Sequence, residues 1–496
     1  MTRPVLPREI ELPLRLEGAV WGHLVADAVG VPYEFRPAAG IGEVRFGERG
    51  THAQPKGTWS DDGALMLALL DSLLRGFDTE DQGRSALAWF RKGRYAPGST
   101  VFDYGNATSA AMRRLEAGTP AEQAGGTGEH DCGNGSLMRI LPLALDYRSA
   151  DRATLVDRAH RASKVTHGHP RPQVACALYV LVARALLDGA DDRQAALDEA
   201  KEWLRAHYAP DPARTDALEH LLAWPEREGR GRVWDSFWSA WDAFAGAESY
   251  VETVERAVRY GNDTDTTAAI AGGLAGIWWG LPGIPADWLA GMRNPEIVWP
   301  LVDGLLKVEN WRTSTTSPLR VDCVKTDKTP GQGKIGITFL PGKRDPAGGS
   351  GRHWRTLEAD RRALVELGVN RFVLLVEDHE LEKFGVPSIV ERFAAGPDLI
   401  RYPIPDVDVP ADAAHFADRL AGPMLGWLQA GESVAVACLG GLQRSGMVAA
   451  CVLGDLGVAP KEAIELVRAA RPKAILTLDQ KRFVHDYASR GPVGQT

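Results

Sequence analysis

The sequence predicts a multidomain protein, with a helical domain followed by an α/β domain that contains a largely parallel sheet. Three observations lead to this prediction. The chain has 496 residues, which is more than one hydrophobic core usually serves. Between Pro13 and Leu306, apolar residues recur at three- and four-residue spacing, as they do on the buried side of helices. After Pro318, short β-branched segments alternate with helical stretches, which is typical of βα units.

The helical part has its clearest patterns over residues 64–74, 174–187, 195–207 and 264–279. The polar segment 309–317 ends before a proline and is predicted to be a linker. The predicted domains are therefore 13–308 and 318–490. In the second domain we expect strands at 335–339, 371–376, 399–404 and 433–438, and helices at 355–367, 411–429, 446–456 and 460–470.

Composition excludes several classes of function. A net charge of -8 without a long basic run argues against binding nucleic acid or anionic membranes through bulk charge, although a modified nucleic acid stays open as a substrate. The longest uncharged stretch, 266–286, contains two prolines and is predicted to be a buried helix rather than a membrane span. The N-terminus lacks a secretory pattern, and the 5 cysteines form no Cys-x-x-Cys pair. We therefore expect a cytoplasmic protein with no membrane partner and no structural zinc.

Two acidic clusters lie where loops enter apolar helices. The first is Ser60-Asp61-Asp62, and the second is Asp263-Thr264-Asp265-Thr266. Each cluster alone is compatible with a helix cap, because Asp, Ser and Thr satisfy free N–H groups at helix N-termini. Adjacent carboxylates repel one another, however, and a hard divalent cation would neutralise them. Taken singly, the clusters leave the cap and the metal site as open alternatives.

Further motifs accompany these clusters along the chain. They are Gly22-His-Leu-Val-Ala-Asp27-Ala-Val-Gly30-Val-Pro-Tyr-Glu34-Phe, Asp103-Tyr-Gly105-Asn106, Gly133-Asn134-Gly135-Ser136-Leu-Met138-Arg139 and Thr166-His167-Gly-His-Pro170. In this order the set resembles the ADP-ribosylglycohydrolase family, over roughly residues 15–300. The resemblance implies an all-α fold and a binuclear Mg²⁺ or Mn²⁺ site. Its implied metal ligands are Ser60, Asp61, Asp62, Asp263, Asp265 and Thr266.

Cleavage at the anomeric carbon of ribose needs a carboxylate that moves a proton, and the resemblance makes Glu34 and Asp103 the candidates. Either could instead be a surface or capping carboxylate. The backbone of Gly133, Asn134, Gly135 and Ser136, helped by His167, is the candidate site for the diphosphate, unless it is only a Gly-rich turn. The chain departs from the familiar pattern with Ser60 in place of Thr and with Gly63 after the paired aspartates. The loss of a hydroxyl at Gly63 puts metal affinity in question.

The predicted strand 433–438 leads into Cys438, followed by Gly440, Gly441, Arg444 and Ser445 and then by an apolar helix. A loop of N–H groups at a helix N-terminus lowers the pKa of a thiol and can hold a tetrahedral anion. Arg444 can bind two phosphate oxygens, and Ser445 can stabilise the departing thiolate. This pattern predicts a nucleophilic cysteine, and the alternative is a small buried apolar residue.

The loop resembles those of the dual-specificity, protein-tyrosine-phosphatase type, and residues 318–490 resemble the kinase-associated phosphatase subgroup that acts on cyclin-dependent kinases. The resemblance implies that Asp406 is the general acid, with Asp408 as the alternative, and that Gln480 orients the hydrolytic water. It implies no cofactor for this domain. Ala437 stands where the family usually has His, so the expectation is either lower activity or phosphate binding alone.

The predicted function is a bifunctional hydrolase. It would release ADP-ribose from a modified protein or another ADP-ribosyl conjugate, and it would cleave a phosphorylated protein or a small phosphomonoester. In one alternative, the second domain only reads phosphate and delivers the glycohydrolase to phosphorylated partners. In another, the first domain binds ADP-ribose and metal without turnover, although its retained aspartates argue against this.

Overall fold

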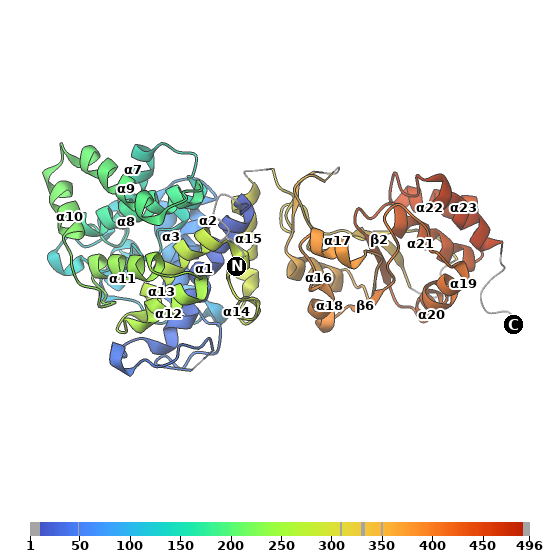
Figure 1. The fold of residues 1–496 in the computed structure, drawn as a ribbon, viewed down its shortest axis with the longest axis horizontal. Coiled ribbons are helices and arrows are strands. Elements are labelled where there is room, and N and C mark those ends of the chain that lie inside the picture. Colours follow the sequence, from blue (N-terminus) through green and yellow to red (C-terminus); the bar gives the residue numbers. More distant parts are fainter. Residues whose placement is uncertain (1–9, 48, 308–309, 329–332, 349–350, 490–496) are drawn as a thin grey trace. The chain divides into compact units, whose positions relative to one another are not determined.

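The computed structural model describes residues 10–47, 49–307, 310–328, 333–348 and 351–489. Its contacts divide the chain into two compact units, Met1–Leu305 and Leu306–Thr496. Figure 1 colours the first unit from blue to yellow-green and the second from yellow to red. Residues 308, 309 and 490, which end or begin predicted segments, lie outside the described ranges.

The first unit is helical, and its described residues contain no strand, as the predicted all-α fold requires. Figure 1 shows its helices gathered around α1 and α13. The helices are α1 (Leu12–Gly30), α2 (Asp61–Leu73), α3 (Thr79–Lys92), α4 (Asn106–Glu116), α5 (Ala121–Ala124), α6 (Pro142–Asp146), α7 (Arg152–Lys164), α8 (Pro170–Leu187), α9 (Arg193–Tyr208), α10 (Pro212–Leu222), α11 (Val233–Ala245), α12 (Tyr250–Arg259), α13 (Thr264–Trp279), α14 (Ala286–Ala290) and α15 (Trp299–Lys307).

Helices α1 and α13 touch through their backbones. A Cβ atom added to Gly22 would lie 2.5 Å from the carbonyl oxygen of Gly272, and one added to Gly276 would lie 1.9 Å from that of Gly18. Only glycine permits such an approach. At the other end of the contact, a Cβ atom on Gly30 would lie 2.4 Å from Cα of Asp265. This close packing brings the N-terminus of α13, with its acidic cluster, against the end of α1.

The second unit contains a five-stranded sheet in the order β1-β2-β7-β5-β6. Strand β1 pairs with β2 in antiparallel fashion, and the remaining pairs are parallel, which confirms the predicted α/β class. The strands are β1 (Asp322–Cys323), β2 (Ile335–Phe339), β5 (Arg371–Leu374), β6 (Asp398–Arg401) and β7 (Val434–Cys438), and β3 (Arg344–Asp345) and β4 (His353–Trp354) form a separate hairpin.

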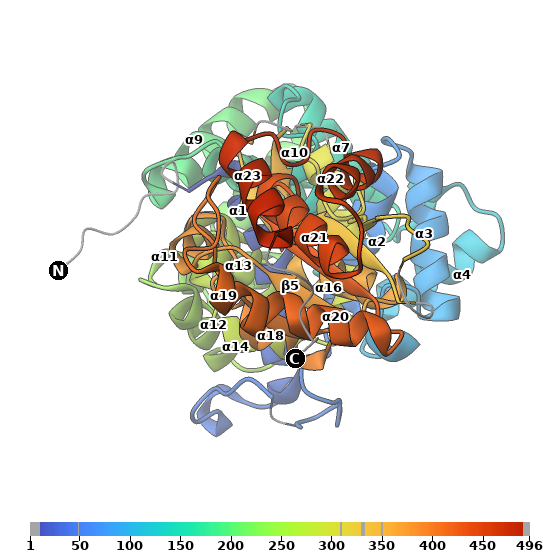
Figure 2. The same ribbon diagram turned by 90° about the vertical axis from the view of Figure 1, so that its right-hand side faces the viewer.

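Helices cover both faces of this sheet, and alternate strand residues enter two separate hydrophobic clusters. Val436 and Cys438 face α19 (Ala413–Phe416), α20 (Gly422–Gln429), α21 (Gln443–Asp455), α22 (Pro460–Ala470) and α23 (Leu478–Ala488). Ala435 and Ala437 face α16 (Leu357–Glu366), α17 (Asp378–Lys383) and α18 (Ile389–Arg392). In the turned view of Figure 2, α22 and α23 lie beside α21, with which both pack.

Two predicted segments differ from the structure. Residues 311–317, predicted to be a linker, pack on the second unit: Trp311 is buried, and the Arg355 guanidinium donates to the carbonyls of Thr313 and Ser317. The predicted helix 411–429 is divided by a π-helical turn, Ala417–Ala421, just before Pro423. Proline lacks the N–H that a continuous helix needs at this position.

Over the described ranges, none of the helices combines the length and the apolar character needed to cross a bilayer. In the uncharged stretch 266–286, residues 266–279 lie in the buried helix α13, which confirms a buried helix here, but the helix ends at Trp279 and so is shorter than the stretch.

Candidate functional site

The two acidic clusters of the first unit lie at the N-termini of α2 and α13 and meet there. Ser60 is the N-cap of α2 and accepts a hydrogen bond from the backbone N–H of Asp62, so the capping interpretation is correct for this residue. The hydroxyl of Thr266 also donates to Asp62 Oδ2 over 3.1 Å, across 204 residues of sequence. A cap alone does not require this second contact, and the two clusters therefore form one site.

This cluster is buried and strongly electronegative. Burial raises the pKa values of Asp61, Asp62 and Asp265 well above the ordinary range, and the neighbouring carboxylates raise them further. Burial likewise raises the pKa of Asp263. Within the described part of the chain, Asp62 Oδ1 and Asp265 Oδ2 are buried without a hydrogen-bond partner. Such oxygens cost free energy unless a proton or a cation occupies the space beside them.

The donor set fits a hard divalent cation. Single carboxylate oxygens of Glu34, Asp263 and Asp265 all lie within 4.8 Å of one another. Carboxylate and hydroxyl oxygens are the ligands that Mg²⁺ and Mn²⁺ prefer. At Gly63 an added Cβ would lie 2.6 Å from the Leu24 side chain and 2.8 Å from that of Trp59. These two side chains fill the space in which a hydroxyl residue would stand.

Glu34 and Asp103, the two candidate acids, lie close together beside the same nitrogen of one imidazole. His52 Nε2 contacts the Glu34 carboxylate and lies 3.9 Å from Asp103 Oδ1. Burial raises the pKa of Glu34 to about 11, and the charge of Asp103 adds to the shift. Both effects favour the protonated form of Glu34. Sequence reasoning missed His52, which lies outside every motif.

The Gly-rich segment is at the site, and the side chains of Asn134 and Ser136 make contacts other than with a ligand, which leaves the predicted role of the backbone N–H groups as a prediction. Asn134 Nδ2 donates to Asp263 Oδ2 over 2.8 Å, so this side chain orients a carboxylate. The Ser136 hydroxyl accepts from that of Ser163 and is fully buried, which makes it part of the core. The His167 ring lies against Gly135, where an added Cβ would be 2.8 Å from its Cε1. Burial lowers the pKa of His167 to about 3, so the ring is neutral.

In the second unit, β7 ends at Cys438 and α21 begins at Gln443, which is three residues earlier than predicted. Arg444 and Ser445 thus belong to the first turn of the helix. Cys438 Sγ lies 3.3 Å from the Ser445 hydroxyl. Burial opposes ionisation of this thiol, but the positive charge of Arg444 and the hydrogen bonds from Ser445 outweigh it and lower the pKa of Cys438. The thiol has the environment of a nucleophile.

Arg444 is fully buried and held from two directions. Its Nη1 and Nη2 atoms lie 2.7 Å and 2.8 Å from the two carboxylate oxygens of Glu380, and Nη2 is also 2.9 Å from Asp406 Oδ1. The Nε–H group is buried and, in the described ranges, has no partner. This leaves one donor of the guanidinium free for an anion at the loop.

Comparisons with known proteins agree with this division of the chain. The model of the ADP-ribosylglycohydrolase family matches residues 10–314. The chain belongs to the ADP-ribosylglycohydrolase family. It is 29% identical over 283 residues to the ADP-ribosylarginine hydrolase Tri1 of Pseudomonas putida (strain GB-1), which covers 55% of this chain and 73% of that protein. A solved ADP-ribosylglycohydrolase-related protein complex is 33% identical, with a TM-score of 0.51, over 60% of this chain and 98% of that chain.

The C-terminal part has a different relative. Over 140 residues it is 30% identical to the cyclin-dependent kinase inhibitor 3 of Sus scrofa, which covers 27% of this chain and 65% of that protein. The similarity is thus confined to a stretch outside the glycohydrolase match.

In the glycohydrolase unit, Asp27 is a further residue to which sequence reasoning gave no role. It is fully buried near the end of α1, and its carboxylate accepts from the backbone N–H groups of Ser60, at 3.0 Å, and Gly63, at 2.8 Å. Burial raises its pKa to about 7. The signal was present, because a carboxylate among the apolar residues of a helix needs a buried partner. Asp27 holds the turn that presents Asp61 and Asp62.

The glutamine predicted to orient water makes a backbone contact in the structure. Gln480 is fully buried, and its Nε2 donates to the carbonyl of Asp408 over 3.0 Å. This contact braces the segment that carries Asp406 and Asp408, called the acid segment, while Oε1 of Gln480 is buried and has no partner among the described residues. The role of Gln480 in orienting water therefore stays a prediction. Glu380, which holds Arg444, was missed because it lies on α17, 64 residues away in sequence.

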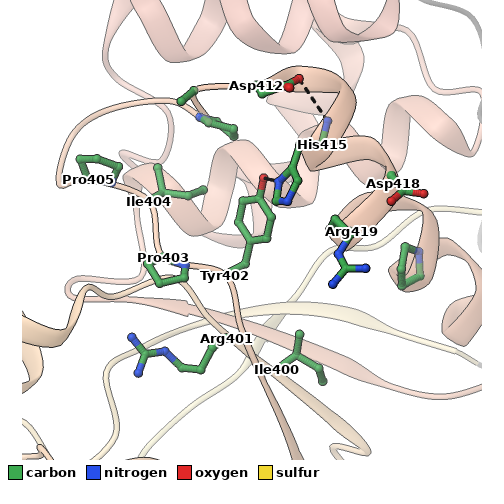
Figure 3. A pocket seen from close by; sticks show the side chains of 13 residues that line it. Ile400, Arg401, Tyr402, Pro403, Ile404, Pro405, Asp412, His415, Asp418 and Arg419 are labelled. Atoms are coloured by element: carbon green, nitrogen blue, oxygen red, sulfur yellow. Dashed lines mark hydrogen bonds between the residues drawn. The ribbon is translucent and has the colours of Figure 1, made fainter.

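A hollow of about 650 Å³ lies beside the acid segment and is lined by Tyr402, Ile404 and Pro405. Figure 3 shows Tyr402 and His415 pointing toward one another, joined by a hydrogen bond of 3.1 Å. The opposite wall carries Asp418 and Arg419. Residues of the Cys438 loop do not line this hollow, which therefore belongs to the outer side of the acid segment.

Proposed function

We propose that this chain is a bifunctional hydrolase that removes ADP-ribose from a modified target and cleaves phosphomonoesters. Family membership supports the first activity, and its relative Tri1 is named as an ADP-ribosylarginine hydrolase. The observation that carries it is the pair of buried oxygens, Asp62 Oδ1 and Asp265 Oδ2, which have no partner among the described residues. They support a binuclear Mg²⁺ or Mn²⁺ site held by Ser60, Asp61, Asp62, Asp263, Asp265 and Thr266.

The glycohydrolase reaction forms a bond from water to the anomeric carbon of ribose and breaks the bond to the acceptor group. A bound divalent ion would supply Lewis acidity and hold ribose hydroxyls and water. Glu34 and Asp103 transfer the protons in this reaction. One carboxylate accepts a proton from the attacking water, and the other donates a proton to the acceptor group as it leaves. His52 presents Nε2 to both carboxylates and can hold them in position.

The second reaction uses the Cys438 loop. The thiolate forms a bond to phosphorus while the bond from phosphorus to the leaving oxygen breaks, and Asp406 protonates that oxygen. Arg444 binds the phosphoryl oxygens through its free Nε–H group. Water then cleaves the cysteinyl phosphate, and Ser445 stabilises the thiolate that leaves. We propose a phosphorylated protein or a small phosphomonoester as substrate, and a cytoplasmic location for the whole enzyme.

One observation favours a phosphate-reading role for the second unit instead. Nη1 and Nη2 of Arg444 are already bonded to Glu380, and Asp406 also occupies Nη2. Together with Ala437 in place of the usual His, this arrangement supports anion binding with slow turnover.

Two assays test the proposal. Release of free ADP-ribose from a panel of arginine, serine, base and small-molecule conjugates should require Mg²⁺ or Mn²⁺ and should be lost in an Asp61→Ala, Asp263→Ala variant. Hydrolysis of p-nitrophenyl phosphate by the wild-type chain, compared with Cys438→Ser, tests the second activity. Saturable vanadate binding without hydrolysis would establish the phosphate-reading role in its place.

A further inference from the structure

A buried lysine lies against the Cys438 loop. Strands β2 and β7 are parallel, with Phe339 opposite Cys438, so the loops that follow both strands leave the same edge of the sheet. Lys343 lies four positions after Phe339 and is only 3% exposed. Its Nζ atom is 3.5 Å from the carbonyl oxygen of Leu439, the residue that follows Cys438. The ammonium group is thus packed on the first peptide of the loop.

The backbone before Lys343 is held firmly. Gly342 has φ +70°, and a Cβ atom there would lie 2.7 Å from Cβ of Leu357, so only glycine fits. Its N–H donates to Asp360 Oδ2 over 2.9 Å. Arg355 fixes the same carboxylate with two contacts of 2.7 Å. These contacts fix the backbone from which the Lys343 side chain extends.

The contacts of the ammonium group are too long to compensate its burial. The Asp345 carboxylate is 3.8 Å away, and the centroid of the Phe339 ring is 5.7 Å away. Charge-assisted N–H···O contacts are usually about 2.7–2.9 Å long. A buried ammonium without a close anion costs free energy. Burial accordingly lowers the pKa of Lys343, while Asp345 and an ionised Cys438 act in the opposite direction.

The other cations around the loop are already neutralised. Arg444 contacts both Glu380 and Asp406, so its single positive charge faces two carboxylates. Arg471 donates to the carbonyls of Gly440 and Gly441 while it pairs with Asp322.

Behind them, Arg355 pairs with Asp360. Burial and the charge of Lys343 lower the pKa of His353 to about 3, so this ring is neutral. Of the cations named around the loop, Lys343 has the most distant carboxylate.

We propose that Lys343 is the positioning residue whose charge stabilises the Cys438 thiolate, in the role that Ala437 leaves unfilled. Ala437 cannot take part, because its side chain packs among the hydrophobic residues on the opposite face of the sheet. This inference rests on the proposed phosphatase function and deepens it. The same ammonium is placed to attract the anionic phosphoryl group that the loop receives.

The test measures the pH midpoint of Cys438 alkylation by iodoacetate in the full-length chain, with the Cys438 peptide quantified by mass spectrometry. Peptide analysis is needed because Cys323 is exposed and will also react. Lys343→Met removes the charge at similar length, Lys343→Arg retains it, and Lys461→Met is a matched control at an exposed position of α22. The midpoint, rather than the rate, is the readout, because iodoacetate is itself an anion that Lys343 would attract.

Lys343→Met should raise the midpoint by about one pH unit, which is roughly a ten-fold loss of thiolate below the midpoint. Lys343→Arg and Lys461→Met should leave it near the wild-type value. An unchanged midpoint in Lys343→Met would overturn the inference. A wild-type midpoint like that of a free cysteine would instead refute the nucleophile on which the proposed phosphatase function depends.

A second variant keeps the inference testable if Lys343→Met does not fold. Asp345→Asn removes the carboxylate that partly offsets Lys343 and leaves the lysine in place. The midpoint should then fall, because the ammonium acts on the thiol without a competing anion. A midpoint that rises or stays constant in Asp345→Asn would also contradict the role of Lys343.

Discussion

Four aspartates of the first unit, Asp61, Asp62, Asp263 and Asp265, form its acid cluster. This cluster and the Cys438 loop of the second unit both lie at helix N-termini, but their charge is balanced differently. In the acid cluster, Asp61, Asp62 and Asp265 are buried together and their pKa values are raised. In the loop, neighbouring donors and Arg444 lower the pKa of Cys438 despite its burial. A helix N-terminus favours anions in both cases. The difference lies in the number of buried carboxylates, which favours protonation in the first unit or the binding of the cation proposed above.

The largest effect is expected from the nucleophile. Cys438→Ser should lower phosphatase turnover on the order of 10⁴-fold or more, because no other group forms the covalent bond. Vanadate binding should survive in this variant and disappear in Arg444→Ala, since Arg444 holds the anion. ADP-ribose release should be the same in both variants. If Cys438→Ser kept the phosphatase activity of the wild type, Cys438 would not be the nucleophile.

Removal of the cation tests the acid cluster. With Mg²⁺ at about 1,000 times its dissociation constant, the folded unit should gain about 4 kcal/mol, and EDTA should remove this stabilisation. Calorimetry of the full chain, with and without EDTA, measures it. The Asp61→Ala, Asp263→Ala variant should melt at a temperature that no longer depends on Mg²⁺. Full glycohydrolase activity in metal-stripped protein would contradict the proposed site.

The boundary between the units can be tested through Trp311. This side chain is 4% exposed and its ring centroid lies 5.3 Å from that of Trp354, within the second unit. A fragment 314–496 should therefore be less stable than 306–496 by about 3 kcal/mol, as expected for the loss of a buried tryptophan. Urea unfolding of both fragments, with Trp311→Ala in the longer one as control, gives the difference. Equal stability of the two fragments would instead support the prediction that residues 309–317 form a linker.

Asp27 offers a smaller and more specific perturbation. Asp27→Asn keeps the shape of the side chain but loses one of the acceptors that hold Ser60 and Gly63. We expect metal affinity to fall by about ten-fold, as is typical for groups that orient metal ligands. Isothermal titration with Mn²⁺ would measure the change. Affinity unchanged from the wild type would mean that the turn is held without this carboxylate.

A further effect concerns pH. Burial raises the folded-state pKa of Asp27 from 3.8 to about 7, so the metal-free folded state binds more protons than the unfolded state between these values. Stability of the metal-free unit should therefore fall as pH rises through this window. A bound metal would displace protons from the cluster, so Mg²⁺ should stabilise the folded unit more at about pH 8 than at about pH 5.5. The added stability should grow by roughly 1.4 kcal/mol per pH unit for each proton displaced. A constant difference in melting temperature would exclude this coupling.

Local pattern was sufficient to predict several elements. The buried helix from 264 to 279, the strand from 335 to 339 and the helix from 460 to 470 have the predicted bounds. The contacts of Gln480 and Ser136 could not be predicted in this way, because only packing decides whether a polar side chain faces a site or the interior. Ser136 follows a glycine turn and Gln480 begins a helix, and both positions are equally compatible with exposure.

The sequence by itself determined the two classes of domain, the acidic clusters at two helix starts and the strand, loop and helix around Cys438. These follow from short-range periodicity and from residue types that are adjacent in the chain. The tertiary structure decided which distant groups complete each site. Asn134 reaches Asp263 across 129 residues of sequence and Thr266 reaches Asp62 across 204, while Glu380 and Lys343 reach the loop because parallel strands end at one sheet edge. Such partners depend on three-dimensional packing, which no local spacing in the chain records.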